Sequence, residues 1–232
     1  MDSSRAAEQG VVHKLAADDW SRKRFLRMVG GAGAAGALAT LVAACGEEEK
    51  VETGPGAPVK EGESDVAIVS YALLLELLEA DFYRQAIASG EIKDREFAEY
   101  ARKILLNEEE HVDALAATEQ QLAGPGVVLP KTDFESVFVG GEQKILATAA
   151  IVENVGASAY LGQADKILSE DVLAAALAIH TVEARHAAGL NDLARNGFKG
   201  EGNLIGSVPD GPFAKPKSMD EVMELVKPFF AS

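Results

Sequence analysis

Two short motifs on predicted helices each place a histidine three residues after a glutamate. They are Glu108-x-x-His111, within LLNEEEHVDAL, and Glu183-x-x-His186, within HTVEARHAAGL. Residues three apart share one face of a helix, so each pair can direct a carboxylate and an imidazole toward one point. Carboxylate and neutral imidazole groups are ligands for iron, manganese and zinc. Because the chain has only four histidines, two such motifs indicate a metal site.

Two further glutamates, Glu76 and Glu153, complete the predicted ligand set. They precede the glutamates of the two motifs by 32 and 30 residues, and each precedes a tyrosine, Tyr83 or Tyr160, by seven. Seven residues are nearly two helical turns, so each tyrosine lies on the face of its glutamate. We expect both tyrosines to be core residues whose hydroxyls bond a carboxylate. This internal repeat selects Glu76 over the neighbouring Glu79.

The predicted site brings four glutamates into a helical core. Four ionised carboxylates would repel one another strongly there, and two divalent cations would neutralise them. Without metal, several of these carboxyls should stay protonated. Glu79 is either an additional ligand or a hydrogen-bonded residue, and His180 is either a core histidine or a neighbour of the site. The predicted metal ligands are Glu76, Glu108, His111, Glu153, Glu183 and His186.

Helix-start and helix-stop residues predict four long helices that position these side chains. Ser64, Asp94 and Ser169 can begin helices, and Gly90, Gly124 and Gly197 can end them. Capping-box patterns in TDFE and SMDE predict a short helical turn in the middle of the chain and a short last helix closed by Pro228. No segment shows strand alternation. The predicted helices cover residues 65–89, 94–123, 142–168 and 169–196, with a C-terminal loop and short helix over residues 197–232.

The fold class is therefore all-α: two helical hairpins joined by a long crossover, forming a four-helix bundle over residues 65–196. The six predicted ligands, in their order and spacing, resemble the di-iron carboxylate motif of the ferritin-like superfamily, which includes bacterioferritins and rubrerythrins. The stretch LLLELLEADFY is similar to the first helix of exported ferritin-like domain proteins. The resemblance covers about residues 65–196 and implies a ferritin-like four-helix bundle.

The same resemblance implies a dinuclear centre of two iron ions, with manganese as the alternative metal. Such a centre would react with O2 or peroxide, by ferroxidase-like oxidation of Fe(II) or by peroxide reduction. A metal-binding or structural module at the cell surface, without catalytic turnover, is the alternative function. Whether the chain forms a homodimer is left open.

The N-terminal residues predict export and membrane attachment. The segment Ser21–Cys45 has a basic cluster followed by uncharged, Gly- and Ala-rich residues, which are too weakly apolar for a stable membrane span. It resembles a twin-arginine signal in which Lys23 replaces the second arginine. LVAAC resembles a bacterial lipobox, which implies cleavage after residue 44 and lipidation of Cys45. Residues 45–64 then form a flexible tether, and the protein is periplasmic or on the outer face of the cell membrane.

Net charge and cysteine content limit the remaining possibilities. The formal charge of −15 argues against nucleic acid as a partner, because contacts to phosphate require basic surfaces. Cys45 is the only cysteine, so an intrachain disulfide is excluded. The expected partners are therefore metal ions, O2 or peroxide, and a membrane that is reached through the lipid on Cys45.

Overall fold

The computed structural model describes residues 63–194 and 214–231, so the predicted export signal, the lipidation site Cys45 and most of the predicted tether lie outside the described residues. Within them the fold is all-α, without strands, and the predicted four-helix bundle is confirmed. Two short helices, one in the crossover and one near the C-terminus, accompany the four long ones. The helices are α3 (Glu63–Ser89), α4 (Arg95–Gln121), α5 (Glu135–Phe138), α6 (Glu142–Gln163), α7 (Glu170–Leu193) and α8 (Met219–Val226).

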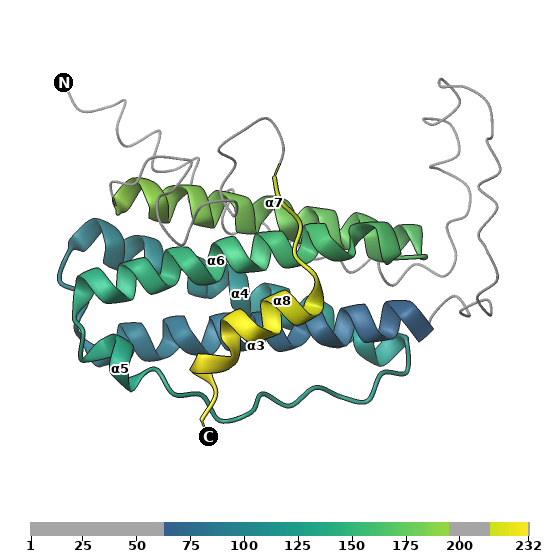
Figure 1. Ribbon diagram of the computed structural model, residues 1–232, viewed down its shortest axis with the longest axis horizontal. Coiled ribbons are helices and arrows are strands. Elements are labelled where there is room, and N and C mark those ends of the chain that lie inside the picture. Colours follow the sequence, from purple (N-terminus) through teal and green to yellow (C-terminus); the bar gives the residue numbers. More distant parts are fainter. Residues whose placement is uncertain (1–62, 195–213, 232) are drawn as a thin grey trace, which may run out of the picture. The chain divides into compact units, whose positions relative to one another are not determined.

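The four long helices pair as two hairpins. Helix α3 packs along α4, helix α6 packs along α7, and contacts between α3 and α6 hold the two hairpins together. The connection from α4 to α6 runs along the length of the bundle, so these two helices point in the same direction (Figure 1). This is the long crossover that the sequence predicts. It brings the middle turns of all four long helices to the same level.

Several helix ends follow the predicted capping chemistry. The side chain of Asp94 accepts a hydrogen bond from the backbone N–H of Phe97 at the start of α4. Ser169 caps α7 in the same way, and Ser218 forms a complete capping box at the start of α8. After α3, Gly90 has a φ of +68°, a conformation that glycine adopts without strain.

Other predicted helix ends are wrong. Ser64 lies inside α3, because this helix begins at Glu63. Helix α6 ends at Gln163, five residues before the predicted end, and a 3₁₀ turn, Ala164–Lys166, follows it. Helix α7 ends at Leu193, with Ala194 as its C-cap, three residues before the predicted end at residue 196.

The predicted capping box at residues 132–135 is also wrong, although the short helix that it predicts does form. Thr132 instead donates its hydroxyl to Asp81 of α3 and accepts a hydrogen bond from Gln85 of the same helix. Phe134 takes the N-cap position of α5 without a side-chain hydrogen bond, and the side chain of Asp133 accepts the backbone N–H of Glu135 instead. The hydroxyl of Thr132 therefore binds the crossover to α3. This contact joins residues far apart in the sequence, so the sequence pattern around Thr132 does not reveal it.

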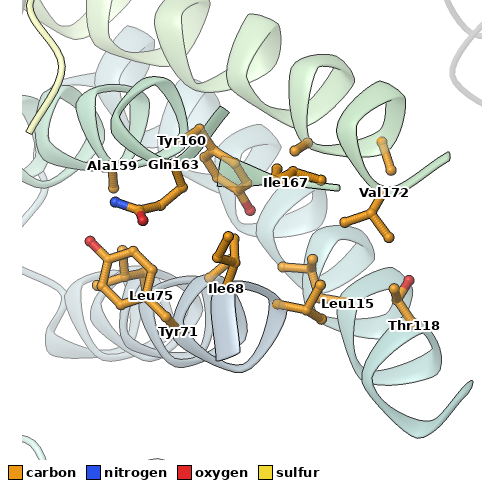
Figure 2. Close-up of a pocket in the computed structure, with 14 residues that line it drawn as sticks. Ile68, Tyr71, Leu75, Leu115, Thr118, Ala159, Tyr160, Gln163, Ile167 and Val172 are labelled. Carbon is orange, nitrogen blue, oxygen red and sulfur yellow. The ribbon is translucent and has the colours of Figure 1, made fainter. Parts of the chain in front are cut away.

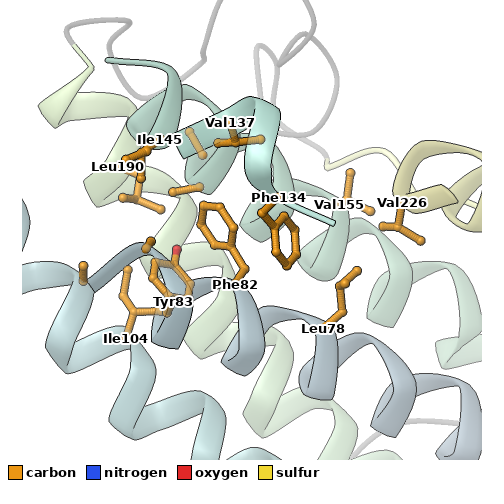
Figure 3. Close-up of a cluster of buried hydrophobic side chains, with 14 of the residues drawn as sticks. Leu78, Phe82, Tyr83, Ile104, Phe134, Val137, Ile145, Val155, Leu190 and Val226 are labelled. Atoms are coloured by element: carbon orange, nitrogen blue, oxygen red, sulfur yellow. The ribbon is translucent and has the colours of Figure 1, made fainter. Parts of the chain in front are cut away.

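An aromatic and aliphatic core fills one half of the bundle and includes the crossover. Phe134 of the crossover meets Phe82 of α3 edge to face, with 5.2 Å between the ring centroids. Tyr83 meets the other side of Phe82 at the same distance, and Val226 of α8 lies in the same cluster (Figure 3). Aromatic pairs of this geometry add about 0.5–1.5 kcal/mol beyond their buried area. The crossover and α8 are thus parts of the core that supports α3.

Helix α6 is long and apolar enough to cross a membrane by length and composition alone. However, 72% of its most apolar window is buried inside the bundle. Its middle residue Glu153 is fully buried and faces the other helices. The apolar character of α6 is therefore explained by its position in the centre of the protein.

We expect the substitution Asp65→Ala to lower the free energy of unfolding by about 1–3 kcal/mol, the cost of leaving buried hydrogen-bonding groups unpaired. Asp65 is buried in the first turn of α3, and its two carboxylate oxygens accept the backbone N–H groups of Leu168 and Ser169. It therefore connects α3 to the turn before α7. Urea denaturation followed by circular dichroism measures the loss.

The matched control is Asp171→Ala, which removes an exposed aspartate from the first turn of α7. This change also removes a negative charge near the same turn, but it breaks no buried hydrogen bond. An equal effect of the two substitutions would contradict the role assigned to Asp65.

Candidate metal centre

The bundle core contains six buried metal-ligating side chains at mid-height. Helices α3 and α6 contribute one glutamate each, and helices α4 and α7 contribute one glutamate and one histidine each. The four glutamates have no exposed surface, and the two histidines are 8% and 6% exposed. The six residues are Glu76, Glu108, His111, Glu153, Glu183 and His186, the same set that the sequence motifs select.

These side chains form two overlapping groups in which the potential ligand atoms all lie within 4.8 Å of one another. The first group adds Glu76 and His111 to a shared pair of carboxylates, and the second adds Glu153 and His186. The shared pair is Glu108 and Glu183, one from each hairpin. Two carboxylates common to two neighbouring groups are suited to lie between two cations.

Each imidazole meets carboxylates from both hairpins. The Nδ1 atom of His111 lies 3.1 Å from Oε2 of Glu76 and 3.2 Å from Oε1 of Glu183. The Nδ1 atom of His186 lies 3.0 Å from Oε1 of Glu108 and 3.0 Å from Oε2 of Glu153. The two halves of the site are therefore arranged alike, as the internal repeat of the sequence suggests.

In the metal-free protein, protons on several side chains offset the negative charges of the buried glutamates. Burial and then the charge of Glu153 raise the pKa of Glu108 to about 7. Burial and then the charge of Glu108 raise the pKa of Glu183 well above its usual range. Burial opposes the charged form of His186, yet the charge of Glu153, the hydrogen bonds to Glu108 and Glu153, and the charge of Glu108 together outweigh it and raise the pKa of His186 to about 11. A bound cation could take the place of these protons.

The carboxylates also retain unused acceptor atoms. Oε1 of Glu153 and Oε2 of Glu183 have no hydrogen-bond partner among the described residues, and Oε1 of Glu108 and Oε1 of Glu183 meet only the imidazole Nδ1 atoms described above, without full hydrogen-bond geometry. Buried polar atoms are rarely left unpaired in native proteins, so several unpaired carboxylate oxygens in one cluster need an explanation. Four carboxylates and two imidazoles with free lone pairs fit two divalent transition-metal ions.

Glu79 borders the site without belonging to either group. It is 3% exposed, and burial and then the charge of Glu183 raise its pKa well above its usual range. Its carboxyl lies against Gly156 of α6, where an added Cβ would stand 2.7 Å from Oε1 of Glu79. A glycine at this place therefore makes room for a fifth carboxyl beside the ligands. The sequence left the role of Glu79 open, and no sequence pattern reveals its proximity to Gly156.

His180 and Glu109 lie away from the cluster. His180 is half-buried, and its Nδ1 atom lies 3.0 Å from the backbone carbonyl of Ala157. It is thus a half-buried histidine that contacts the backbone of α6 and belongs to neither ligand group. Glu109 is on the surface of α4, where it pairs with Arg84, and the next residue, Glu110, is also exposed.

We expect Tyr160→Phe to lower the free energy of unfolding by about 1–3 kcal/mol, because it leaves a buried carboxylate oxygen without its donor. The hydroxyl of Tyr160 donates a hydrogen bond of 2.5 Å to Oε1 of Glu76, as predicted. The hydroxyl of Tyr83 lies buried beside Glu153: burial, and then the charge of Glu153 and a contact with its carboxylate, raise the pKa of that tyrosine, although the contact falls short of full hydrogen-bond geometry. Tyr83→Phe is therefore the matched control.

Both tyrosine variants remove one buried oxygen atom from the same core. Thermal unfolding at neutral pH should separate them, with a lower Tm for Tyr160→Phe and a Tm near that of the wild type for Tyr83→Phe. A Tm for Tyr160→Phe at or above that of Tyr83→Phe would show that the Tyr160–Glu76 hydrogen bond adds no stability.

A sequence model of a known protein family matches the part of the chain that contains the site. The sequence model described as a ferritin-like domain matches residues 64–196, more than half of the chain and all of the helices that carry the six side chains. Comparison with curated proteins gives no match for this chain.

Proposed function

The chain belongs to the ferritin-like domain family, and we propose that its buried cluster binds two iron ions, or manganese, and uses them to reduce O2 or peroxide. The observation that carries this proposal is the pair of overlapping ligand groups that share Glu108 and Glu183. A single metal would need only one group. Two groups with two carboxylates in common provide for two ions that act together.

The protein residues would divide the work as follows. Glu76 with His111, and Glu153 with His186, would each hold one ion, and the shared carboxylates Glu108 and Glu183 would hold both. Tyr160 orients the carboxylate of Glu76 through its hydrogen bond. The apolar walls of the bundle exclude water from the ligands.

A bound pair of metal ions would supply redox chemistry, because two ferrous ions together can release two electrons. With two protons, these electrons convert O2 to hydrogen peroxide, or hydrogen peroxide to two molecules of water. The raised pKa values of Glu108 and Glu183 identify carboxyls that carry protons in the metal-free protein. Loading the site releases these protons into solution, since the ligands must be deprotonated.

Anaerobic titration followed by exposure to oxidant tests the proposal. The purified protein should bind two equivalents of Fe(II) per chain without oxygen. Addition of O2 or hydrogen peroxide should then oxidise the bound iron, with a fast rise of absorbance in the near ultraviolet and consumption of the oxidant. Stoichiometric binding without consumption of either oxidant would instead favour a module that only holds metal. Failure to bind any divalent transition metal would contradict the proposed site itself.

We also propose that the protein acts outside the cytoplasm, anchored by a lipid on Cys45. The support is the sequence alone: a basic cluster and an uncharged segment that end at LVAAC. Labelling of growing cells with a fatty acid should modify the wild-type chain and not a Cys45→Ser variant. Cell fractionation should find the wild type in the membrane fraction, and equal labelling of both chains would contradict the anchor.

A further inference from the structure

A cavity of about 30 Å³ lies between the four long helices at one end of the bundle (Figure 2). Its walls come from the first turns of α3 and α7 and from the last turns of α4 and α6. A cavity needs about 10–15 Å³ of such space to admit a molecule the size of water, so this one holds a very small ligand. Representative wall residues are Ile68, Leu115, Ile167, Val172 and Ala175.

Tyr160 joins this cavity to the metal-ligand cluster. Its side chain lines the cavity, and its hydroxyl donates to Oε1 of Glu76. Leu75, the residue before Glu76, lies in the same wall. Tyr160 therefore both lines the cavity and contacts a carboxylate of the cluster.

The chemistry of the walls selects a nonpolar molecule. Most of the lining is hydrocarbon, and the hydroxyl of Thr118 is already donated to the carbonyl of Ala114. The remaining polar atoms are the hydroxyl of Tyr71 and Nε2 of Gln163, which are buried and have no hydrogen-bond partner. They leave the opposite wall, at Leu115 and Val172, wholly apolar (Figure 2).

These walls distinguish the two oxidants. Hydrogen peroxide would exchange its hydrogen bonds to water for mostly hydrocarbon contacts, and the two unpaired polar atoms of the lining, on Tyr71 and Gln163, would replace only part of them. Dioxygen is apolar and loses no comparable hydrogen bonds when it enters. The size of the cavity also suits a diatomic molecule.

We propose that this cavity is a binding and access site for dioxygen, which reaches the carboxylate–histidine cluster past Tyr160. The inference rests on the proposed function and makes it more specific, because it names O2 as the oxidant that this route serves. Hydrogen peroxide would have to reach the cluster by another path. Blocking the cavity should therefore slow the reaction with O2 and leave the reaction with peroxide unchanged.

Xenon binding tests the cavity without any metal or activity. Xenon is an apolar probe of similar size, and we expect it to bind the metal-free full-length protein with a shifted ¹²⁹Xe resonance. Ala175→Leu places a larger side chain in the cavity and should abolish this signal. Ala174→Leu, an exposed change at the neighbouring position of the same helix, should retain it. Absence of xenon binding to the wild type would overturn the inference.

Oxidation kinetics test the access role. In Ala175→Leu, iron loading should remain at two equivalents, and the rate of Fe(II) oxidation by O2 should fall by about tenfold, the effect of a barrier raised by about 1.4 kcal/mol. The rate with hydrogen peroxide should stay at the wild-type value, and Ala174→Leu should match the wild type with both oxidants. Should leucine prevent folding, Ala175→Val gives the smaller change in the same direction.

The possible failures are distinguishable. Equal O2 rates in Ala175→Leu and the wild type would overturn the access role while leaving the metal centre intact. Equal slowing with O2 and peroxide would show that the substitution disturbs the ligands, which also overturns it. If the iron-loaded wild type reacts with neither oxidant, the proposed function fails, whatever the xenon measurement gives.

Discussion

Replacing Glu183 with glutamine is expected to remove both metal ions, whereas replacing His111 with alanine removes only one. Glu183 belongs to both ligand groups, and His111 belongs to one. Glutamine has nearly the volume of glutamate but no negative charge. The affinity for metal at both positions should fall by at least about 100-fold. Removing a residue that only hydrogen-bonds to a metal ligand already lowers affinity by up to about this amount. Anaerobic titration with Fe(II) or Mn(II), followed by elemental analysis, measures the stoichiometry.

A folding control separates this loss from simple unfolding. Burial and the charge of Glu108 keep Glu183 protonated in the metal-free protein, so a neutral glutamine there should leave the metal-free Tm unchanged or higher. Glu170→Gln, an exposed change in the first turn of the same helix, should bind two equivalents. Two equivalents bound by Glu183→Gln would contradict the shared role of this residue.

Raising the pH from 5 to 8 is expected to lower the Tm of the metal-free protein. In the folded protein the pKa of Glu108 is raised to about 7, and that of Glu183 is raised well above its usual range. The folded protein therefore keeps protons on these two carboxyls at pH values above 4.5, where the unfolded chain releases them. Their contribution to stability is complete below pH 4.5 and is lost as the pH rises through the folded-state values. The raised pKa of His186, about 11, acts in the same direction above pH 6.5. Each retained proton changes the unfolding free energy by about 1.4 kcal/mol per pH unit.

Glu76 differs from the other glutamates, since the charge of His111 and several hydrogen bonds outweigh its burial and lower its pKa. Its contribution to stability is lost only when the pH falls below 4.5, outside this range. Differential scanning calorimetry after treatment with a chelator provides the measurement. A metal-free Tm that rises from pH 5 to pH 8 would contradict the protonated cluster.

Added Mn(II) should have the opposite pH dependence. Metal ligands must lose their protons, so binding and the resulting rise in Tm should both increase with pH. At a free metal concentration of 100 times the Kd, the stabilisation is about 2.7 kcal/mol. A chelator that leaves Tm unchanged in metal-loaded protein would count against a metal in this core.

Much of this arrangement could be predicted from the sequence because the chemistry is unusual for its setting. Glutamate and histidine three residues apart on an otherwise apolar helix have few other uses, and the two motifs fix which face of α4 and α7 turns inward. The repeat of a glutamate and a tyrosine then identifies Glu76 and Glu153 on the other two helices. Helical spacing alone places these residues on the correct faces, and the long crossover sets their common height.

What could not be predicted depends on contacts between distant segments. Thr132 matches a capping box, but Asp81 and Gln85 on α3 compete for its hydroxyl. The position of Glu79 beside Gly156 requires the packing of α3 on α6, which neither segment encodes alone. The apolar cavity likewise exists only where four helix ends meet, so no single stretch of sequence indicates it.

The two histidines each lie against carboxylates from both hairpins, and this geometry has a consequence for exchange of the ion. No hairpin possesses a full set of donors, and all of the donors are buried, with only the two imidazoles slightly exposed. An ion could leave only when α3 and α4 part from α6 and α7, a motion that opposes the whole interior packing. We therefore expect release over hours rather than seconds, so that the metal recovered with the protein records the compartment in which the chain first folded.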